Sequence, residues 1–245
     1  SQEQGGYAQP GVVTGKPVEI GGSLGRNHAT GLGVIYTCER AMEMKGKSMK
    51  DARIVIQGFG NVGSFAAKFA TDRGSRVIAV SDVSGGYFNG DGLNILEMME
   101  YAKANKSLAG YTKAQKLTNA ELLELDCDAL LPCALEGQID THNAEKIKAK
   151  FVVEGANGPV TNAATKILDQ RGVTIVPDLI ANGGGVIVSY FEWVQDIMSF
   201  FWDEADIDQK LKGIIIKAYD NIYKFQAEKK TDMRSAAMAV SIQRL

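Results

Sequence analysis

Short apolar runs alternate along the chain with longer segments whose apolar residues recur at helical spacing. The short runs are rich in β-branched residues, as buried strands of a parallel sheet are. They predict strands over residues 52–58, 76–82, 127–133, 151–156 and 173–178. The longer segments predict helices over residues 28–46, 61–73, 92–105 and 163–170, and almost continuously from residue 185. This alternation favours an α/β fold: a Rossmann-like, doubly wound, mostly parallel sheet with helices on both faces and a helical C-terminal segment.

Two shorter segments also have helical features. Residues 118–121 have the form of a capping box, and residues 143–149 are polar and helix-forming. We expect a single dinucleotide-binding domain over residues 1–245, made of an irregular lead-in (1–25), an α/β core (26–184) and a mainly helical segment (185–245). The last residues stop inside a helical pattern without a cap, which indicates a piece of a longer protein.

Composition excludes several classes of protein. The 245 residues are 45% hydrophobic and 23% charged with a net charge of −2, as in globular proteins and unlike disordered, collagen-like or coiled-coil chains. The near-neutral balance offers no basic surface for nucleic acid, and no apolar run approaches the ~18 residues of a membrane span. The cysteines are too few and too widely spaced for a disulfide framework. With two histidines and no CxxC pair we predict no metal site, and we expect a reduced, cytoplasmic setting.

The strongest local signal is the run Gly58-Phe59-Gly60-Asn61-Val62-Gly63, which follows a predicted strand. In a dinucleotide-binding turn, the first glycine permits the tight turn, the second lets the backbone approach a pyrophosphate, and the third lets helix and strand pack closely. The helix that follows offers N–H groups to the phosphates. Glycine-rich turns are common, so the context matters: Asp82 ends the next strand, and 82 − 63 = 19 is close to the ~20 residues of the fingerprint. We therefore predict a dinucleotide site here.

Asp82 also bears on the choice of cofactor. A carboxylate there can accept hydrogen bonds from both ribose hydroxyls and repel a 2′-phosphate, which favours NAD over NADP. No Arg or Lys between Val83 and Asn94 could hold such a phosphate. NADP stays possible, because an acidic residue does not by itself exclude the phosphate. Asp82 could instead form a turn or cap before Ser84.

Two later glycine-rich loops follow predicted strands and contain Asn157 and Asn182. Ligands of open α/β sheets bind outside the carboxyl ends of the strands, so both loops can meet the cofactor. An asparagine amide offers a donor and an acceptor to a ribose hydroxyl or a nicotinamide carboxamide. Equally, Asn and Gly could simply supply left-handed backbone geometry. Residues 11–17 resemble a P-loop only superficially, because the spacing is short and Pro17 stands where a magnesium-binding hydroxyl is needed.

The remaining candidates favour structural roles. His28 and His142 have no carboxylate or nucleophile at a suggestive spacing, and we expect them at a polar surface or a helix cap. We expect the three cysteines to fill core positions, because no flanking charges would lower their pKa. The aromatic run within residues 189–202 predicts a packing face of a helix, and an exposed part of it could contact another domain.

The segment GGSLGRNHATGLGV, residues 21–34, resembles the GGSxGRxxATGxGV signature of glutamate dehydrogenases. Further similar motifs follow in order along nearly the whole chain: VIQGFGNVG, AVSDVSGGYFN, DALLPCALEGQI, FVVEGANGPVT and VPDLIANGGGVIVSYFEW. The chain is similar to the cofactor-binding half of the hexameric bacterial and archaeal enzymes, without the long insertion that forms the antenna of the animal enzyme. The resemblance assigns the pyrophosphate loop to residues 58–63 and adenosine-ribose recognition to Asp82.

The resemblance also implies roles for residues outside that loop. Thr30, Asn157 and Asn182 match family positions that line the nicotinamide end of the cofactor. Ser189 matches the serine that contacts the side-chain carboxylate of the substrate. Arg26 matches the arginine of the signature, and we assign it no role.

The implied reaction is oxidative deamination of L-glutamate to 2-oxoglutarate and ammonia, with a hydride passing to NAD or NADP. In this family the substrate-holding lysines, the lysine that activates water and the essential aspartate belong to an N-terminal domain that precedes the region where this sequence starts. We therefore expect no catalytic residue in this chain, which should bind the cofactor without turnover. We expect it to be a monomer, whereas the parent enzyme is expected to be a homohexamer that meets L-glutamate and 2-oxoglutarate through the other domain.

Three other interpretations stay open. A dehydrogenase of leucine, valine or phenylalanine shares the layout, although the GGSxGR and VSYFEW segments favour glutamate. The chain could also be a stand-alone binding or assembly module. A methyltransferase would bind S-adenosylmethionine with a glycine loop and an acidic strand end, but the two later Asn/Gly loops argue against it.

Overall fold

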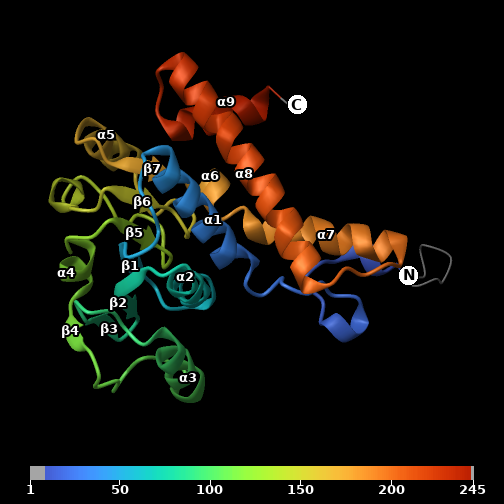
Figure 1. The fold of residues 1–245 in the computed structure, drawn as a ribbon, viewed down its shortest axis with the longest axis horizontal. Helices are drawn as coiled ribbons and strands as arrows, with labels where there is room; N and C mark the ends of the chain where they lie inside the picture. The colour runs from blue at the N-terminus through green and yellow to red at the C-terminus, as the bar shows by residue number, and fades with distance from the viewer. Residues whose placement is uncertain (1–8, 244–245) are drawn as a thin grey trace.

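The computed structural model describes residues 9–243, and within that range the strands form one seven-stranded sheet (Figure 1). The strand order is β4-β3-β2-β1-β5-β6-β7. The strands are β1 Arg53–Gln57, β2 Arg76–Asp82, β3 Gly85–Phe88, β4 Gln115–Leu117, β5 Ala129–Pro132, β6 Phe151–Val153 and β7 Thr174–Val176. Strands β2, β1, β5, β6 and β7 are parallel, and β3 and β4 are antiparallel at one edge. The predicted α/β fold with a mostly parallel sheet is confirmed.

Helices cover both faces of this sheet. The side chains of β1 alternate between two cores: Ile54 and Ile56 pack with α1, α2, α7, α8 and α9, whereas Val55 packs with α4 and α5. The helices are α1 Ala29–Met44, α2 Asn61–Asp72, α3 Ile95–Asn105, α4 Asn119–Leu123, α5 Asn162–Gln170, α6 Asp178–Ala181, α7 Gly184–Met198, α8 Glu204–Lys229 and α9 Met233–Ile242. The sheet is therefore doubly wound, and its carboxyl ends are free to form a site.

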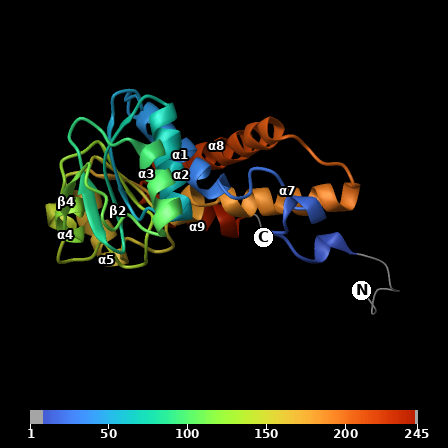
Figure 2. The ribbon, with the colours of Figure 1, turned by 90° about the horizontal axis from the view of Figure 1, so that it is seen from below.

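Helix α7, the start of α8 and the N-terminal lead-in extend together beyond the sheet (Figures 1 and 2). The lead-in contains two short 3-10 helices, η2 Pro10–Val12 and η3 Val18–Ile20. Between them, the Nζ atom of Lys16 donates to Glu192 Oε1 and Asp196 Oδ2 of α7, each at 2.7 Å. Both carboxylates are buried, so this pair fixes the lead-in to α7. Residues 1–8 of the predicted lead-in and 244–245 of the predicted helical segment lie outside the described residues.

The structure corrects three details of the sequence prediction. Strands β3 and β4 were not predicted, because β3 begins with two glycines and β4 is only three residues long and mostly exposed. Residues 143–149 form only one 3-10 turn, η4 Ala144–Lys146. The C-terminal helical segment is three helices, since left-handed residues Ser199 and Lys230, with φ of 50° and 51°, end α7 and α8.

Among the described residues, no helix combines the length and the apolar character that crossing a membrane would require. In the same range, no group of three or more His, Cys, Asp or Glu side chains is arranged to hold a metal ion.

Candidate cofactor site

The turn between β1 and α2 has the geometry that the glycine pattern predicts. Gly58 has a left-handed φ of +93°, and a Cβ there would lie 2.9 Å from the backbone of Ala134. A Cβ on Gly63 would lie 1.7 Å from the carbonyl oxygen of Gly58, so only glycine lets α2 pack this closely. Nothing lies within 4 Å of a Cβ on Gly60, whose backbone therefore faces open space. No described side chain caps α2 at Gly60, which leaves the first amides of the helix available to an anion.

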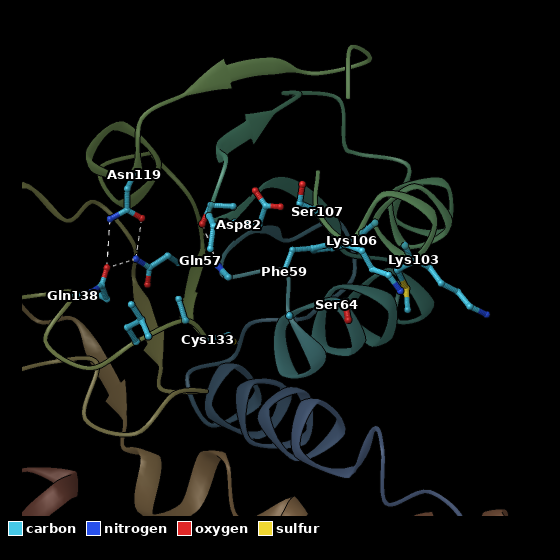
Figure 3. A pocket seen from close by; sticks show the side chains of 18 of the residues that line it. Gln57, Phe59, Ser64, Asp82, Lys103, Lys106, Ser107, Asn119, Cys133 and Gln138 are labelled. Atoms are coloured by element: carbon cyan, nitrogen blue, oxygen red, sulfur yellow. Dashed lines mark hydrogen bonds between the residues drawn. The ribbon is translucent and has the colours of Figure 1, made fainter. Parts of the chain in front are cut away.

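A cavity of about 830 Å³, the glycine-loop cavity, lies beside this turn (Figure 3). The turn contributes Phe59 and Gly60, β2 contributes Asp82, and α3 with the residue that follows it contributes Lys103 and Lys106. The volume is within the range of roughly 300–1,000 Å³ that is usual for small-molecule and cofactor sites. The cavity lies outside the carboxyl ends of β1, β2 and β5, where open α/β sheets bind their ligands.

Asp82 lies in the wall of this cavity and is held by two backbone amides and one hydroxyl group. Its Oδ1 atom accepts hydrogen bonds from the amide (2.8 Å) and hydroxyl (2.6 Å) of Ser84, and its Oδ2 atom accepts one from the Leu108 amide (2.6 Å). The alternative role of Asp82 in the turn before Ser84 is therefore present in the structure. The Oδ2 atom accepts only one hydrogen bond and has a lone pair left for a further donor, so the turn role and a ribose role are compatible.

Two lysines bring positive charge to the same cavity. Lys103 and Lys106 lie 103 − 82 = 21 and 106 − 82 = 24 residues after Asp82, on the last turn of α3 and just beyond it. The sequence argument for NAD considered only residues 83–94, so it missed both. Only the packing of α3 against α2, which no local motif encodes, places these lysines beside the glycine loop.

Behind the glycine loop lies a cluster of amide side chains that the sequence did not indicate. The Gln57 Nε2 atom donates to Asn119 Oδ1 (2.8 Å) and to Gln138 Oε1 (2.6 Å), as Figure 3 shows. Gln57 is the last residue of β1 and is buried, and Asn119 begins α4. The cluster therefore fixes the end of β1, from which the glycine loop departs.

The predicted nicotinamide-end residues meet in a second cavity of about 730 Å³, which we call the asparagine hollow. Thr30, Asn157, Asn182 and Ser189 line it together with Arg26. The Asn182 Nδ2 atom donates to Asn157 Oδ1 at 2.7 Å, so the two loops touch through their asparagine side chains. The structure thus brings together the three residues that the resemblance placed at the nicotinamide end and the serine that it assigned to the substrate.

Glycines allow the helices around this hollow to approach one another closely. A Cβ on Gly31 of α1 would lie 2.7 Å from the Val62 carbonyl oxygen of α2. A Cβ on Gly184 of α7 would lie 2.0 Å from the Ala29 carbonyl oxygen of α1, and one on Gly185 would lie 2.5 Å from the Thr30 hydroxyl. The glycines of the two signature segments therefore hold Thr30 and Ser189 around one space.

The remaining members of the predicted pyrophosphate loop have different positions. Phe59 is buried and lines the glycine-loop cavity, and Val62 lines the asparagine hollow. The Asn61 side chain lines neither cavity; its amide donates to the Asn27 carbonyl oxygen at 2.7 Å and so links α2 to the start of α1. If Asn61 contacts a ligand, it does so through its backbone amide at the start of α2.

His28 departs from the sequence prediction. It occupies the N-cap position of α1, but its side chain makes no capping hydrogen bond and is buried rather than exposed. Its ring packs 5.7 and 5.4 Å from the rings of Phe65 and Phe69 and faces the carboxylate of Asp208 at 3.4 Å. His142 is exposed, as expected for a surface residue.

The cysteines agree with the prediction of core positions in two cases. Cys38 and Cys127 are buried, whereas Cys133 is half-buried and lines both cavities. Burial raises the pKa of each thiol to about 12, so none is a thiolate at neutral pH.

The predicted aromatic packing face is divided between core and surface. Phe191 packs edge-on against Trp202, while Tyr190 and Trp193 stack on each other and remain 58% and 42% exposed.

Comparison with known proteins decides between the dehydrogenase and methyltransferase interpretations. Residues 21–245 match the model of the glutamate/leucine/phenylalanine/valine dehydrogenase family. The chain belongs to this family. Glutamate dehydrogenase of Thermotoga maritima is 49% identical over 241 residues, which cover 98% of this chain and 58% of that protein. The catabolic NAD-specific glutamate dehydrogenase RocG of Bacillus subtilis is 46% identical over 97% of this chain and 56% of its own length.

Solved structures of family members have the same fold. A hetero-hexameric glutamate dehydrogenase from Thermus thermophilus, in its Leu-bound form, superposes with a TM-score of 0.93 at 34% identity, over 99% of this chain and 57% of that one. Glutamate dehydrogenase of Peptoniphilus asaccharolyticus superposes with a TM-score of 0.84 at 35% identity, over 96% and 56% of the two chains. This chain thus spans somewhat more than half the length of the family members it matches.

Proposed function

We propose that this chain is the NAD-binding part of a glutamate dehydrogenase that oxidises L-glutamate to 2-oxoglutarate and ammonia. The observation that supports this most is that the two cavities adjoin. Cys133, Ala134 and Leu135 line both of them, and we place an extended dinucleotide from Asp82, past Gly60, into the asparagine hollow. NAD, when bound, supplies the acceptor of the hydride.

The residues along this path fit the successive parts of NAD. The open backbone at Gly60 and the uncapped first turn of α2 fit a pyrophosphate. The free lone pair on Asp82 Oδ2 fits a ribose hydroxyl. Thr30 and the paired amides of Asn157 and Asn182 offer both donors and acceptors, as a carboxamide requires.

The asparagine hollow also favours a substrate that carries an extra carboxylate. Arg26 lines it next to Gly185, and the Arg26 Nε atom is buried with no hydrogen-bond partner among the described residues. A buried guanidinium N–H without an acceptor is costly, and a carboxylate held by Arg26 and Ser189 would supply that acceptor. This favours glutamate over the apolar amino acids of leucine, valine or phenylalanine dehydrogenases.

We further propose that the chain tested alone binds NAD but turns over negligibly. Among the described residues, no lysine lines the asparagine hollow to activate water or hold the substrate. Positioning of reactants is a large part of enzymatic rate, up to about 7–11 kcal/mol of the barrier. Purified chain mixed with L-glutamate and NAD should therefore give no steady-state NADH signal above a blank that lacks glutamate. A sustained, glutamate-dependent signal that Asp82→Ala reduces would contradict this, because it would come from the cofactor site of this chain.

Calorimetric titration with NADH and, separately, NADPH tests the cofactor proposal directly. We expect NADH to bind, and to bind about tenfold more weakly to Asp82→Ala, because lost ribose hydrogen bonds cost roughly 1–1.5 kcal/mol. Asp91→Ala, an exposed aspartate beyond the next strand, should bind NADH like the wild type. Equal affinity for NADH and NADPH would remove Asp82 as the selector and point to Lys103 and Lys106. Binding of neither would overturn the proposed function.

For assembly, we propose that this chain is a monomer while the whole protein is a homohexamer in the cytoplasm. The three unpaired cysteines support the cytoplasmic setting, and the hetero-hexameric Thermus thermophilus relative supports a hexameric whole protein. Light scattering of the purified chain should give the mass of one copy, 26.4 kDa.

A further inference from the structure

The two loops that line the asparagine hollow, residues 154–158 and 178–185, are both bound by a residue of the C-terminal helix α9. Arg234, in the first turn of α9, directs its guanidinium between them. Its Nη1 atom donates to Asp178 Oδ1 at 2.9 Å, and its Nη2 atom donates to Glu154 Oε1 and Oε2 at 2.6 and 2.5 Å. Glu154 is fully buried and the Arg234 side chain is 18% exposed, so the ion pair is largely shielded from water.

The two carboxylates that bind Arg234 also accept hydrogen bonds from backbone amides of the loops. Glu154 directly follows β6, and its Oε2 atom accepts a hydrogen bond from the Asp178 amide at 2.8 Å. Asp178 starts α6, and its Oδ2 atom accepts one from the Gly158 amide at 2.7 Å. Each carboxylate therefore binds the backbone of the other loop as well as Arg234.

The asparagines sit within a few residues of these anchors. Asn157 directly precedes Gly158, and Asn182 is the C-cap of the single-turn helix α6 that begins at Asp178. The two loops are therefore joined twice: by the 2.7 Å hydrogen bond between Asn182 and Asn157 in the hollow, and by Arg234 through Asp178 and Glu154. In the chain, Arg234 is 80 residues from Glu154 and 56 from Asp178.

We propose that Arg234 is a positioning residue for the nicotinamide end of the site: without lining the hollow, it sets the mutual placement of the loops that present Asn157 and Asn182. This rests on the proposed function for the identity of the ligand. A planar guanidinium can serve two carboxylates at once with parallel N–H donors, whereas a lysine ammonium is a single point charge. Helix α9 thereby influences the site, although none of its residues lines the asparagine hollow.

The choice of variants follows from the burial of Glu154. Arg234→Met alone would leave that carboxylate buried without its cation, and the chain could fail to fold. Arg234→Lys keeps the positive charge but loses the planar set of N–H donors that binds both carboxylates at once. The double variant Arg234→Met with Glu154→Gln removes both charges and leaves an amide that can still accept from the Asp178 amide. Arg40→Met is the matched control, because Arg40 also donates two hydrogen bonds to a carboxylate, at 2.7 and 3.1 Å to Asp220 of α8. Both residues lie far from the loops in sequence.

Amide hydrogen exchange on the whole chain at pH 8 tests the coupling without any ligand. In Arg234→Lys and in the double variant, we expect exchange in residues 155–158 and 182–185 to become at least tenfold faster. The amides of residues 62–72 in α2 should keep their wild-type rates, and Arg40→Met should leave both loops unchanged. Unchanged exchange in the loops, or faster exchange throughout the chain, would overturn the proposal, since Arg234 would then be idle or merely structural.

Titration of the same variants with NADH and with ADP-ribose tests the consequence for binding. ADP-ribose shares the adenosine, pyrophosphate and second ribose of NADH but lacks the nicotinamide. We expect the Kd of NADH to rise about tenfold in both Arg234 variants and that of ADP-ribose to change less than twofold. A parallel change of both ligands, or of neither, would overturn the positioning role. Wild-type chain that binds neither ligand would overturn the proposed function, and the exchange data would still decide the coupling.

Discussion

The glycine-loop cavity and the asparagine hollow differ in how far apart their residues lie in the chain. The first depends on one βαβ unit, in which the turn at 58–63 and Asp82 lie within 25 residues. The second depends on Thr30, Asn157, Asn182 and Ser189, which come from three separate segments of the chain. Backbone geometry dominates the first cavity, and contacts between distant side chains dominate the second. The addition of a single Cβ atom to a glycine should therefore damage the first cavity, whereas the second should be sensitive to charged residues that do not line it.

The largest effect should come from Gly63→Ala in the glycine loop. The new Cβ would lie 1.7 Å from the Gly58 carbonyl oxygen, and because this obstacle is backbone it has little room to relax. We expect a loss of about 3 kcal/mol or more in the free energy of unfolding, at the upper end of over-packing effects, together with loss of NADH binding. Urea denaturation and calorimetry measure the two.

Gly60→Ala is the control for this variant, because nothing lies within 4 Å of its Cβ position. It should unfold like the wild type and still bind NADH more weakly, since the methyl group occupies space that the pyrophosphate would approach. If both alanines had the same effect on stability, tight helix–strand packing would not be what Gly63 provides.

The next largest effect should come from Lys16→Met, far from either cavity in sequence. Burial alone would lower the pKa of Lys16, but its hydrogen bonds to Asp196 and Glu192 raise it, so the ammonium is charged at neutral pH. Removing it leaves two buried carboxylates unpaired, which typically costs about 3–5 kcal/mol. Because Ser189 lies on the same helix as both carboxylates, α7 should be loosened beside the asparagine hollow.

Lys68→Met is the matched surface control for Lys16→Met. Lys68 binds Asp72 at the same 2.7 Å, but both side chains are exposed by a third or more. It should change the free energy of unfolding by less than about 1 kcal/mol in urea denaturation. Equal losses in the two variants would show that burial of the Lys16 pair is not what matters.

A third, pH-dependent effect should come from Glu154, behind the asparagine hollow. Burial raises its pKa to about 7, against the lowering influence of Arg234 and with Asp178 as the other charged neighbour. The folded chain therefore holds this proton more tightly than the unfolded chain. The carboxyl stabilises the fold most below its ordinary pKa of 4.5 and loses that contribution as the pH rises through about 7.

Urea denaturation of wild type and Glu154→Gln at pH 5, 6, 7 and 8 measures this. The stability of wild type relative to the variant should fall by up to about 3 kcal/mol across the series. A difference that instead grows with pH would mean that Arg234 outweighs burial and holds the folded carboxyl ionised.

The smallest effect should come from Thr118→Ala, which touches neither cavity wall. The Thr118 hydroxyl accepts a hydrogen bond from the Glu121 amide, and the Glu121 side chain accepts one from the Thr118 amide, which closes a capping box on α4. Loss of the cap should cost about 1 kcal/mol in urea denaturation and leave the Kd of NADH unchanged. A marked loss of NADH binding would show that α4 matters to the cavity through Asn119 and Gln57.

The same contrast explains what the sequence could predict. The parallel strands, the helices between them and the capping box follow from periodicity and local chemistry, and so does the glycine turn. Lys103 and Lys106 could not be assigned to the cofactor site, because only the packing of α3 brings them there. Arg234 was missed for a similar reason: its partners lie 56 and 80 residues away. The burial of His28 depends on Phe65 and Phe69 of another helix, which its own neighbours in the chain do not reveal.

The two edge strands of the sheet, β4 and β7, affect whether copies of this chain aggregate at high concentration. An exposed strand edge can pair with another chain, and natural proteins limit this with short or charged edge strands. At one end, β4 is only three residues long, and its central Lys116 lies over the Tyr87 ring at 3.7 Å and donates to the Ser84 carbonyl oxygen. At the other end, β7 is equally short and packs against α5 and α9. The added β3–β4 pair therefore protects the sheet from edge-to-edge aggregation.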